Sequence, residues 1–157
     1  MINFLDLRGI NSQHEFELKE AASRVIDSGW YLMGKELESF ETNYADFCGV
    51  KHALGVANGL DALRLIFKAY VEMGIMQKGD EVIVPAQSHT ATSHAVEYTG
   101  AKAVFVDIDL ITGNIDPQKI IKKITKKTKA IIIVHMAGLV CQIDLIQKIC
   151  KKYKIKL

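Results

Sequence analysis

A chain of 157 residues, 49% hydrophobic and 24% charged, has the composition of a globular domain that can bury a sizeable core. Its net charge of +2 gives no reason to expect a nucleic-acid partner. The amino terminus has Asp6 where a signal peptide needs apolar residues, and the longest apolar stretch, residues 130–140, is too short to cross a bilayer. We therefore expect a cytoplasmic chain with neither a nucleic-acid nor a membrane partner.

Two helices are predicted in the amino-terminal third of the chain. Ser12 and Glu15 have the spacing of a capping box before an apolar stripe, and Asp27-Ser28-Gly29 ends that helix. After the loop "GWYLMG", a second stripe at helical spacing is formed by Leu37, Phe40, Tyr44 and Phe47. Gly49 stops it. Residues 1–50 are thus expected to form a helical segment.

From residue 53 onward, short apolar runs alternate with helical stretches. The runs, which predict strands, cover residues 53–57, 81–84, 103–106 and 130–134. Helices are predicted at about 60–73, 90–99 and 117–123, with a last one opened by Asp144 with Gln147 and reaching about Tyr153. Strands that are apolar throughout are covered on both faces, and their alternation with helices indicates parallel pairing. We predict an α/β domain over residues 53–157, a parallel sheet with helices on both faces.

The carboxyl end of the chain, "KYKIKL", has the pattern of a fifth strand that begins at about Ile155. A parallel strand normally leads into a further loop and helix. We therefore expect the chain to be the first part of a longer fold, with its carboxyl-terminal part absent.

Four polar segments follow the four predicted strands, where ligands bind in open α/β sheets. They are Asn58-Gly59, "PAQSHTAT" from Pro85, "DID" at 107–109, and "HMAG" from His135. Together they predict a ligand site at this edge of the sheet.

Each of these segments also has a plainer interpretation. Gly59 at a helix start suits the approach of a phosphate, but Asn58 alone is a common helix cap. His89 is a ligand contact or a packed, capping side chain, and His135 is a group at the edge of the site or a buried imidazole. Asp107 and Asp109 show no partner acid for acid–base work.

Three cysteines without tight pairing suggest reduced thiols. Cys48 and His52 have no second close pair to complete a metal site, so we expect small buried residues and no metal.

Three stretches, in this order, resemble the DegT/DnrJ-type sugar-nucleotide aminotransferases. They are "SGWYLMGKELESFETNYADFCGVKHALGVANGLDAL", "GDEVIVPAQSHTATSHAVEYTGAKAVFVDID" and "VHMAGLVCQIDLIQKICKKYKI". The resemblance covers almost the whole chain but only the amino-terminal part of the family's pattern. It implies part of the large domain of the type I pyridoxal-phosphate fold, the fold of aspartate aminotransferase.

The resemblance also implies roles for particular residues. The stretch "NGLDAL" resembles the family's phosphate cradle, which implies that Asn58, Gly59, Leu60 and Asp61 bind the cofactor, the last three through their backbone amides. His89 takes the place of the aromatic residue that stacks on the cofactor ring. A substrate or subunit-interface role is implied for Trp30, Tyr31, Met33, Gly34 and His135.

The resemblance implies an enzyme that uses pyridoxal phosphate to move an amino group from an amino acid, with glutamate the expected donor, to a keto-sugar nucleotide. It further implies a homodimer active in surface-polysaccharide or amino-sugar biosynthesis. The family's pyridinium carboxylate and Schiff-base lysine lie beyond Leu157, so the chain alone is expected to be inactive.

Two alternatives remain open: a non-catalytic chain that binds at most phosphate ligands or a partner subunit, and a sugar-nucleotide dehydratase of the same fold.

Overall fold

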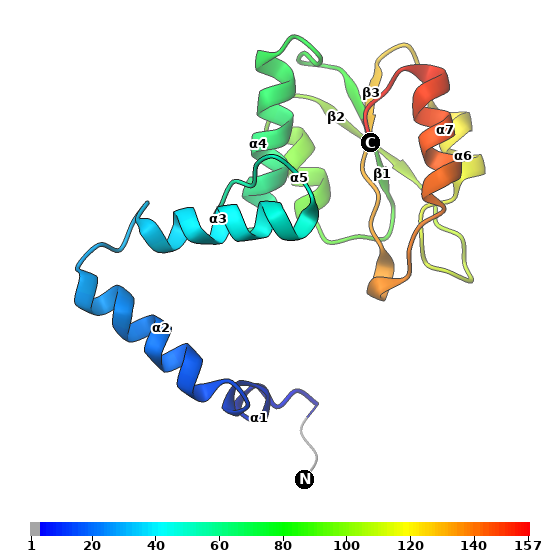
Figure 1. The fold of residues 1–157 in the computed structure, drawn as a ribbon. Coiled ribbons are helices and arrows are strands. Elements are labelled where there is room, and N and C mark those ends of the chain that lie inside the picture. Colours follow the sequence, from blue (N-terminus) through cyan, green and yellow to red (C-terminus); the bar gives the residue numbers. More distant parts are fainter. Residues whose placement is uncertain (1–3) are drawn as a thin grey trace. The chain divides into compact units, whose positions relative to one another are not determined.

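The computed structural model of the chain describes residues 4–157 and divides into two units, Met1–Gly55 and Val56–Leu157. The first unit consists of the helices α1 (Leu7–Ser12), α2 (Glu15–Ser28) and α3 (Lys35–Cys48) (Figure 1). Gly29 and Gly49, with φ angles of 63° and 66°, form the left-handed ends of α2 and α3, as the sequence predicts.

The second unit contains α4 (Gly59–Glu72), β1 (Glu81–Pro85), α5 (Ala91–Glu97), β2 (Lys102–Val106), α6 (Pro117–Lys123), β3 (Thr128–Ile131) and α7 (Ile143–Tyr153). A short 3-10 turn, η1 (Met136–Gly138), precedes α7. The three strands are parallel and lie in the order β2-β1-β3. Within the described residues, no helix is both long and apolar enough to cross a membrane.

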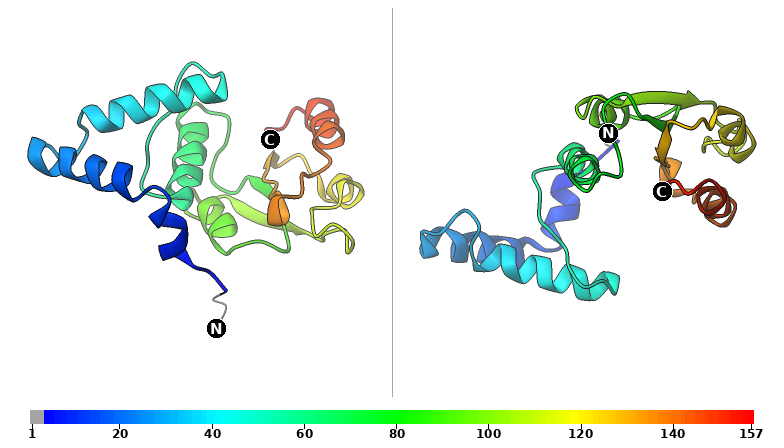
Figure 2. Two further views of the ribbon diagram at one scale, coloured as in Figure 1. Left: turned by 60° about the horizontal axis from the view of Figure 1, so that its bottom comes forward. Right: turned by 90° about the horizontal axis from the view of Figure 1, so that it is seen from above.

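The two faces of the sheet are covered by different helices, which confirms the predicted α/β architecture. Successive side chains of a strand point to opposite faces. Val82 and Val84 of β1 accordingly pack with α4 and α5, whereas Ile83 packs with α6 and α7. Figure 2 shows the two pairs of helices on opposite sides of the strands.

The two helix starts predicted from capping-box spacing, Ser12 with Glu15 and Asp144 with Gln147, are both wrong. Ser12 belongs to α1, where its hydroxyl donates to the carbonyl oxygen of Gly9, and α2 is preceded by His14 instead. The unexpected helix α1 forms because the Asp6 side chain accepts the amide of Gly9 and caps it. Asp144 lies inside the first turn of α7, where a negative charge favours the helix dipole, and the cap position is Gln142.

Three strand predictions also need correction. Residues 53–57 form no strand, because no segment among residues 4–157 pairs with them. The predicted fifth strand is limited to a single parallel bridge between Lys156 and Ala130.

The third correction concerns β3, which ends at Ile131, three residues before the end of its apolar run. Glu81 donates its amide to Lys127 and Ile83 accepts the amide of Ile132, so alternate residues of β1 face β3. The next such residue is Pro85, which has no N–H to donate. The pairing therefore stops there.

Candidate functional site

The predicted site segments lie together at one edge of the sheet in the second unit. The loops that follow β1, β2 and β3 share this edge because the strands are parallel. The amino terminus of α4 lies at the same edge, because α4 runs back past the sheet before the chain enters β1 (Figure 1). The structure thus brings Asn58, Gly59, His89 and His135 to the carboxyl ends of the strands.

The turn at Gly59 offers two free backbone amides at a helix start. Asn58 has extended backbone and caps α4, since its Oδ1 accepts the amide of Asp61 at 3.0 Å. Among the described residues, the amides of Gly59 and Leu60 have no hydrogen-bond partner. A Cβ built on Gly59 would meet no atom within 4 Å. The turn therefore fits a phosphate group with two amides, and the third expected amide, that of Asp61, is already paired.

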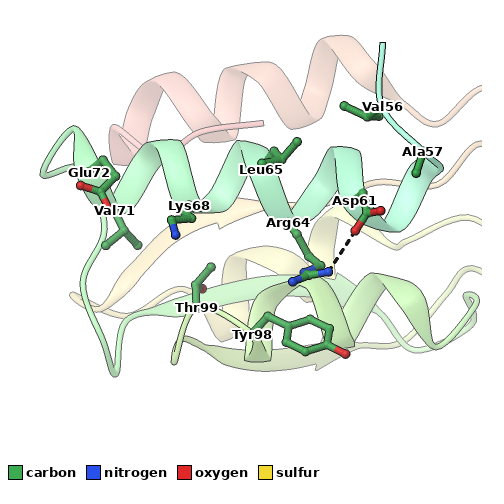
Figure 3. A pocket seen from close by; sticks show the side chains of 10 residues that line it. All are labelled: Val56, Ala57, Asp61, Arg64, Leu65, Lys68, Val71, Glu72, Tyr98 and Thr99. Atoms are coloured by element: carbon green, nitrogen blue, oxygen red, sulfur yellow. Dashed lines mark hydrogen bonds and ion pairs between the residues drawn. The ribbon is translucent and has the colours of Figure 1, made fainter. Parts of the chain in front are cut away.

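The carboxylate of Asp61 is neutralised by a neighbouring arginine. Arg64 Nη1 lies 2.9 Å from Asp61 Oδ1, and the guanidinium carbon lies 4.4 Å from the centre of the Tyr98 ring, within the range of a cation–π contact (Figure 3). These side chains line a groove of about 550 Å³ that also includes Lys68 and Glu72. Arg64 therefore offsets the negative charge of Asp61 beside the free amides.

His89 is exposed and follows β1. Its Nδ1 accepts the amide of Ala91 at 3.1 Å, so the imidazole satisfies one amide at the start of α5. The hydroxyls of Ser88 and Thr92 hydrogen-bond to each other at 2.6 Å. The capping interpretation of His89 is thus seen in the structure, and its exposed ring also remains accessible to a ligand.

His135 is an exposed residue at the edge of the sheet, not a buried imidazole. Its Nδ1 accepts the amide of Cys141 at 3.2 Å, and the Cys141 thiol donates to the carbonyl oxygen of Val134 at 3.1 Å. Burial raises the pKa of the Cys141 thiol, so this group is a structural donor. The turn from His135 to Cys141 is therefore held closed by its own side chains.

Asn114 is a residue of this edge that the sequence does not reveal. It is buried in the loop after β2, and its side-chain amide bonds to two backbone groups of the turn after β3. These partners lie 22 and 25 residues further along the chain, so no local motif marks the contact.

The same loop is organised by Asp109. Its Oδ1 accepts the amide and the hydroxyl of Thr112 and the amide of Ile111, at 2.8, 2.9 and 3.1 Å. The amide of Thr112 is the main cause that lowers the pKa of the Asp109 carboxyl.

We expect this carboxyl to make stability depend on pH in the acid range. Because its pKa is lower folded than unfolded, its contribution is present above the unfolded value and is lost as pH falls through the folded one. The free energy of unfolding should therefore differ more between the parent chain and Asp109→Asn at pH 7 than at pH 3. Urea unfolding at both pH values measures this, and an equal difference at both would contradict it.

The glycine-bracketed loop of the first unit is ordered by its own hydrogen bonds. Trp30 Nε1 donates to the carbonyl oxygen of Leu32, and the Tyr31 hydroxyl donates to that of Ile26. Met33 has a φ angle of 50°, and a Cβ on the buried Gly34 would come within 3.2 Å of the Trp30 ring. Gly34 therefore accommodates the indole, while the side chains of Trp30, Tyr31 and Met33 are exposed.

The cysteines differ in burial. Cys141 and Cys150 are buried, whereas Cys48, the last residue of α3, and the neighbouring His52 are exposed, so the expectation that Cys48 and His52 are small buried residues is wrong.

Comparisons with known proteins show which family the chain is similar to. A model of the DegT/DnrJ/EryC1/StrS aminotransferase family matches residues 12–157. The chain is 49% identical over 99% of its length to a dTDP-3-amino-3,6-dideoxy-alpha-D-galactopyranose transaminase of Aneurinibacillus thermoaerophilus. It is 40% identical, again over 99% of its length, to a UDP-2-acetamido-2-deoxy-3-oxo-D-glucuronate aminotransferase of Pseudomonas aeruginosa. In both cases it spans 42% of the length of the relative.

Solved structures show the same fold. S. venezuelae DesV superposes with a TM-score of 0.90 at 38% identity, over 98% of this chain and 40% of DesV. An E. coli GDP-4-keto-6-deoxy-D-mannose-3-dehydratase with bound hydrated PLP superposes with a TM-score of 0.81 at 35% identity, over 87% of this chain and 36% of that one.

Proposed function

We propose, since the chain belongs to the DegT/DnrJ/EryC1/StrS aminotransferase family, that it forms the amino-terminal part of a pyridoxal-phosphate-dependent sugar-nucleotide aminotransferase. The observation that carries the proposal is the free-amide turn at Gly59, which lies at the same sheet edge as His89 and His135. The proposed reaction moves an amino group from an amino acid, glutamate by preference, to a keto-sugar nucleotide. The proposed setting is a cytoplasmic homodimer in surface-polysaccharide or amino-sugar biosynthesis.

The chain's own residues would bind the cofactor chiefly through its phosphate. The amides of Gly59 and Leu60 donate to phosphate oxygens, and the dipole of α4 favours the negative charge. Arg64 keeps Asp61 from opposing this charge. When bound, pyridoxal phosphate supplies the electron sink for amino-group transfer.

The remaining proposed contacts involve side chains on two loops and in the first unit. The exposed ring of His89 packs against the cofactor ring, while its Nδ1 stays bonded to Ala91. His135 contacts substrate or cofactor from the turn after β3. In the first unit, the ordered loop with Trp30, Tyr31, Met33 and Gly34 contributes to a substrate site or a subunit interface.

A His89→Phe variant should keep or strengthen cofactor binding if the ring stacks, because phenyl offers a larger aromatic face. It should also lose about 1 kcal/mol of stability, since phenyl cannot accept the amide of Ala91. Titration with pyridoxal phosphate and urea unfolding measure the two effects. A stable variant that no longer binds would indicate a hydrogen-bonding or acid–base role for His89.

A dehydratase of the same fold is the second candidate. It is favoured by the TM-score of 0.81 with a GDP-4-keto-6-deoxy-D-mannose-3-dehydratase. The residues that bind phosphate would serve both reactions equally well.

The proposal is tested at two levels. The chain should bind pyridoxal phosphate at least about tenfold more tightly than pyridoxal, because only the former has the phosphate that the Gly59 turn can hold. Equal affinities would contradict the phosphate site.

The complete product of the gene that encodes these residues is then assayed with glutamate and a keto-sugar nucleotide. Amino-sugar nucleotide and 2-oxoglutarate in equal amounts support an aminotransferase. A deoxy-sugar product with no amino group retained would support the dehydratase instead.

A further inference from the structure

We infer that Asn114 is a positioning residue, which locks the turn after β3 to the loop after β2 and thereby fixes His135 in one tautomer at the edge of the site. The inference rests on the proposed function only in taking His135 to face a ligand. We define the clamp as the Asn114 side chain with its two partners, Met136 and Leu139.

The clamp is formed by one side-chain amide that uses both of its ends. Asn114 Nδ2 donates to the carbonyl oxygen of Leu139 at 2.9 Å, and Oδ1 accepts the amide of Met136 at 3.0 Å. The residue is 5% exposed, so neither bond is readily replaced by water. No other common side chain offers a donor and an acceptor in this fixed arrangement except the longer glutamine.

The loop that carries Asn114 is itself held in place by hydrogen bonds. Asp109 donates its amide to the carbonyl oxygen of Asn114 at 2.8 Å, and Asp116 donates to that of Asp107 at 3.2 Å. Asp109 Oδ1 also accepts the amide and the hydroxyl of Thr112, and these bonds close the tip of the loop. Movement of the Asn114 side chain is therefore restricted from its own side.

The turn that the clamp holds has a backbone that needs such support. Ala137 has a φ angle of 50°, in the left-handed region that residues other than glycine rarely adopt. Met136 and Leu139 flank Ala137, so the two clamp bonds hold the chain on either side of it. Without them, only the bonds within the turn, such as those from Gly138 to His135 and from Cys141 to His135, would oppose relaxation of Ala137 to an unstrained path.

The orientation of His135 follows from this turn. Its Nδ1 accepts the amide of Cys141, so the neutral ring must carry its proton on Nε2. The exposed Nε2–H is then a donor for an oxygen acceptor of a bound ligand. If the turn relaxes, the Cys141 amide moves away from Nδ1 and this tautomer is no longer imposed.

The test compares Asn114→Ala with a matched control, Thr128→Val. Thr128 is 4% exposed and its hydroxyl accepts the amide of Thr125 at 2.9 Å, so the control loses a buried polar contact at the opposite end of β3. Imidazole ¹⁵N NMR reports the tautomer of His135, and amide hydrogen exchange reports the Met136 bond. Neither measurement requires a ligand.

In the parent chain we expect His135 to carry its proton on Nε2. In Asn114→Ala the Met136 amide should exchange at least about tenfold faster, and His135 should populate both tautomers. Thr128→Val should leave both properties of the turn unchanged. A parent His135 protonated on Nδ1, or equal effects of the two variants, would overturn the inference.

If Asn114→Ala fails to fold, the inference is tested on the parent chain instead. A scalar coupling across the hydrogen bond from Asn114 Nδ2 to the Leu139 carbonyl carbon supports the clamp, and its absence from a well-resolved spectrum contradicts it.

A titration with pyridoxal phosphate distinguishes failure of the proposed function from failure of the positioning role of Asn114. If the clamp is present but the cofactor does not bind, the proposed function fails and the positioning role stands. If the cofactor binds and the tautomer is independent of Asn114, the positioning role fails alone.

Discussion

Replacing Gly59 with valine should weaken the binding of pyridoxal phosphate by about tenfold or more while leaving the stability of the chain nearly unchanged. The isopropyl group would occupy the space through which a phosphate oxygen must approach the amides of Gly59 and Leu60. The fold should tolerate it, because a Cβ at this position meets no atom within 4 Å. Titration with pyridoxal phosphate and urea unfolding measure the two effects.

Two comparisons make this experiment specific. Gly59→Ala should have an intermediate effect on affinity, because a methyl group fills less of the approach path. Pyridoxal, which has no phosphate, should bind the parent and the valine variant equally. If pyridoxal phosphate binds the normally folded valine variant as tightly as the parent, Asn58 and Gly59 are only a helix start.

Replacing Ile120 with alanine should lower the free energy of unfolding by about 3–4 kcal/mol. Ile120 is fully buried on α6, in the core that includes Ile83 of β1 and Ile146 of α7. The lost methylene contacts leave a cavity between the helix and the sheet. Urea or thermal unfolding followed by circular dichroism measures the loss.

The next residue on the same helix is a matched control. Ile121 is 39% exposed, so Ile121→Ala removes the same atoms with less loss of packing and should cost less than about 1 kcal/mol. Equal losses for the two variants would show that α6 does not pack on the sheet as described.

Elements with a local signal were predictable from the sequence. Asp116 followed by Pro117 marks the start of α6, and the structure begins that helix at Pro117 with Asp116 accepting the amide of Gln118. The apolar runs at 81–84 and 103–106 predict β1 and β2 to within one residue at each end.

The sequence does not predict structure that depends on a distant partner. A strand needs a neighbour, and residues 53–57 have none among the described residues. Ser12 had a competing helix before it, whose formation depends on the Asp6 cap. At the site, the turn at Gly59 was visible in the sequence, but Asn114 was not, because its partners lie in another loop.

The strand order β2-β1-β3 indicates where along the edge of the sheet a ligand would bind. The chain leaves β1 toward the face covered by α5, whereas it leaves β2 and β3 toward the face covered by α6 and α7. The end of β1 is therefore a topological switch point, the place where ligands bind in open α/β sheets. Because Pro85 ends the pairing between β1 and β3 at this point, the backbones are free to part there. A ligand at the end of β1 would lie between the His89 loop, which follows β1, and the His135 turn, which follows the adjacent strand β3, so both could contact it.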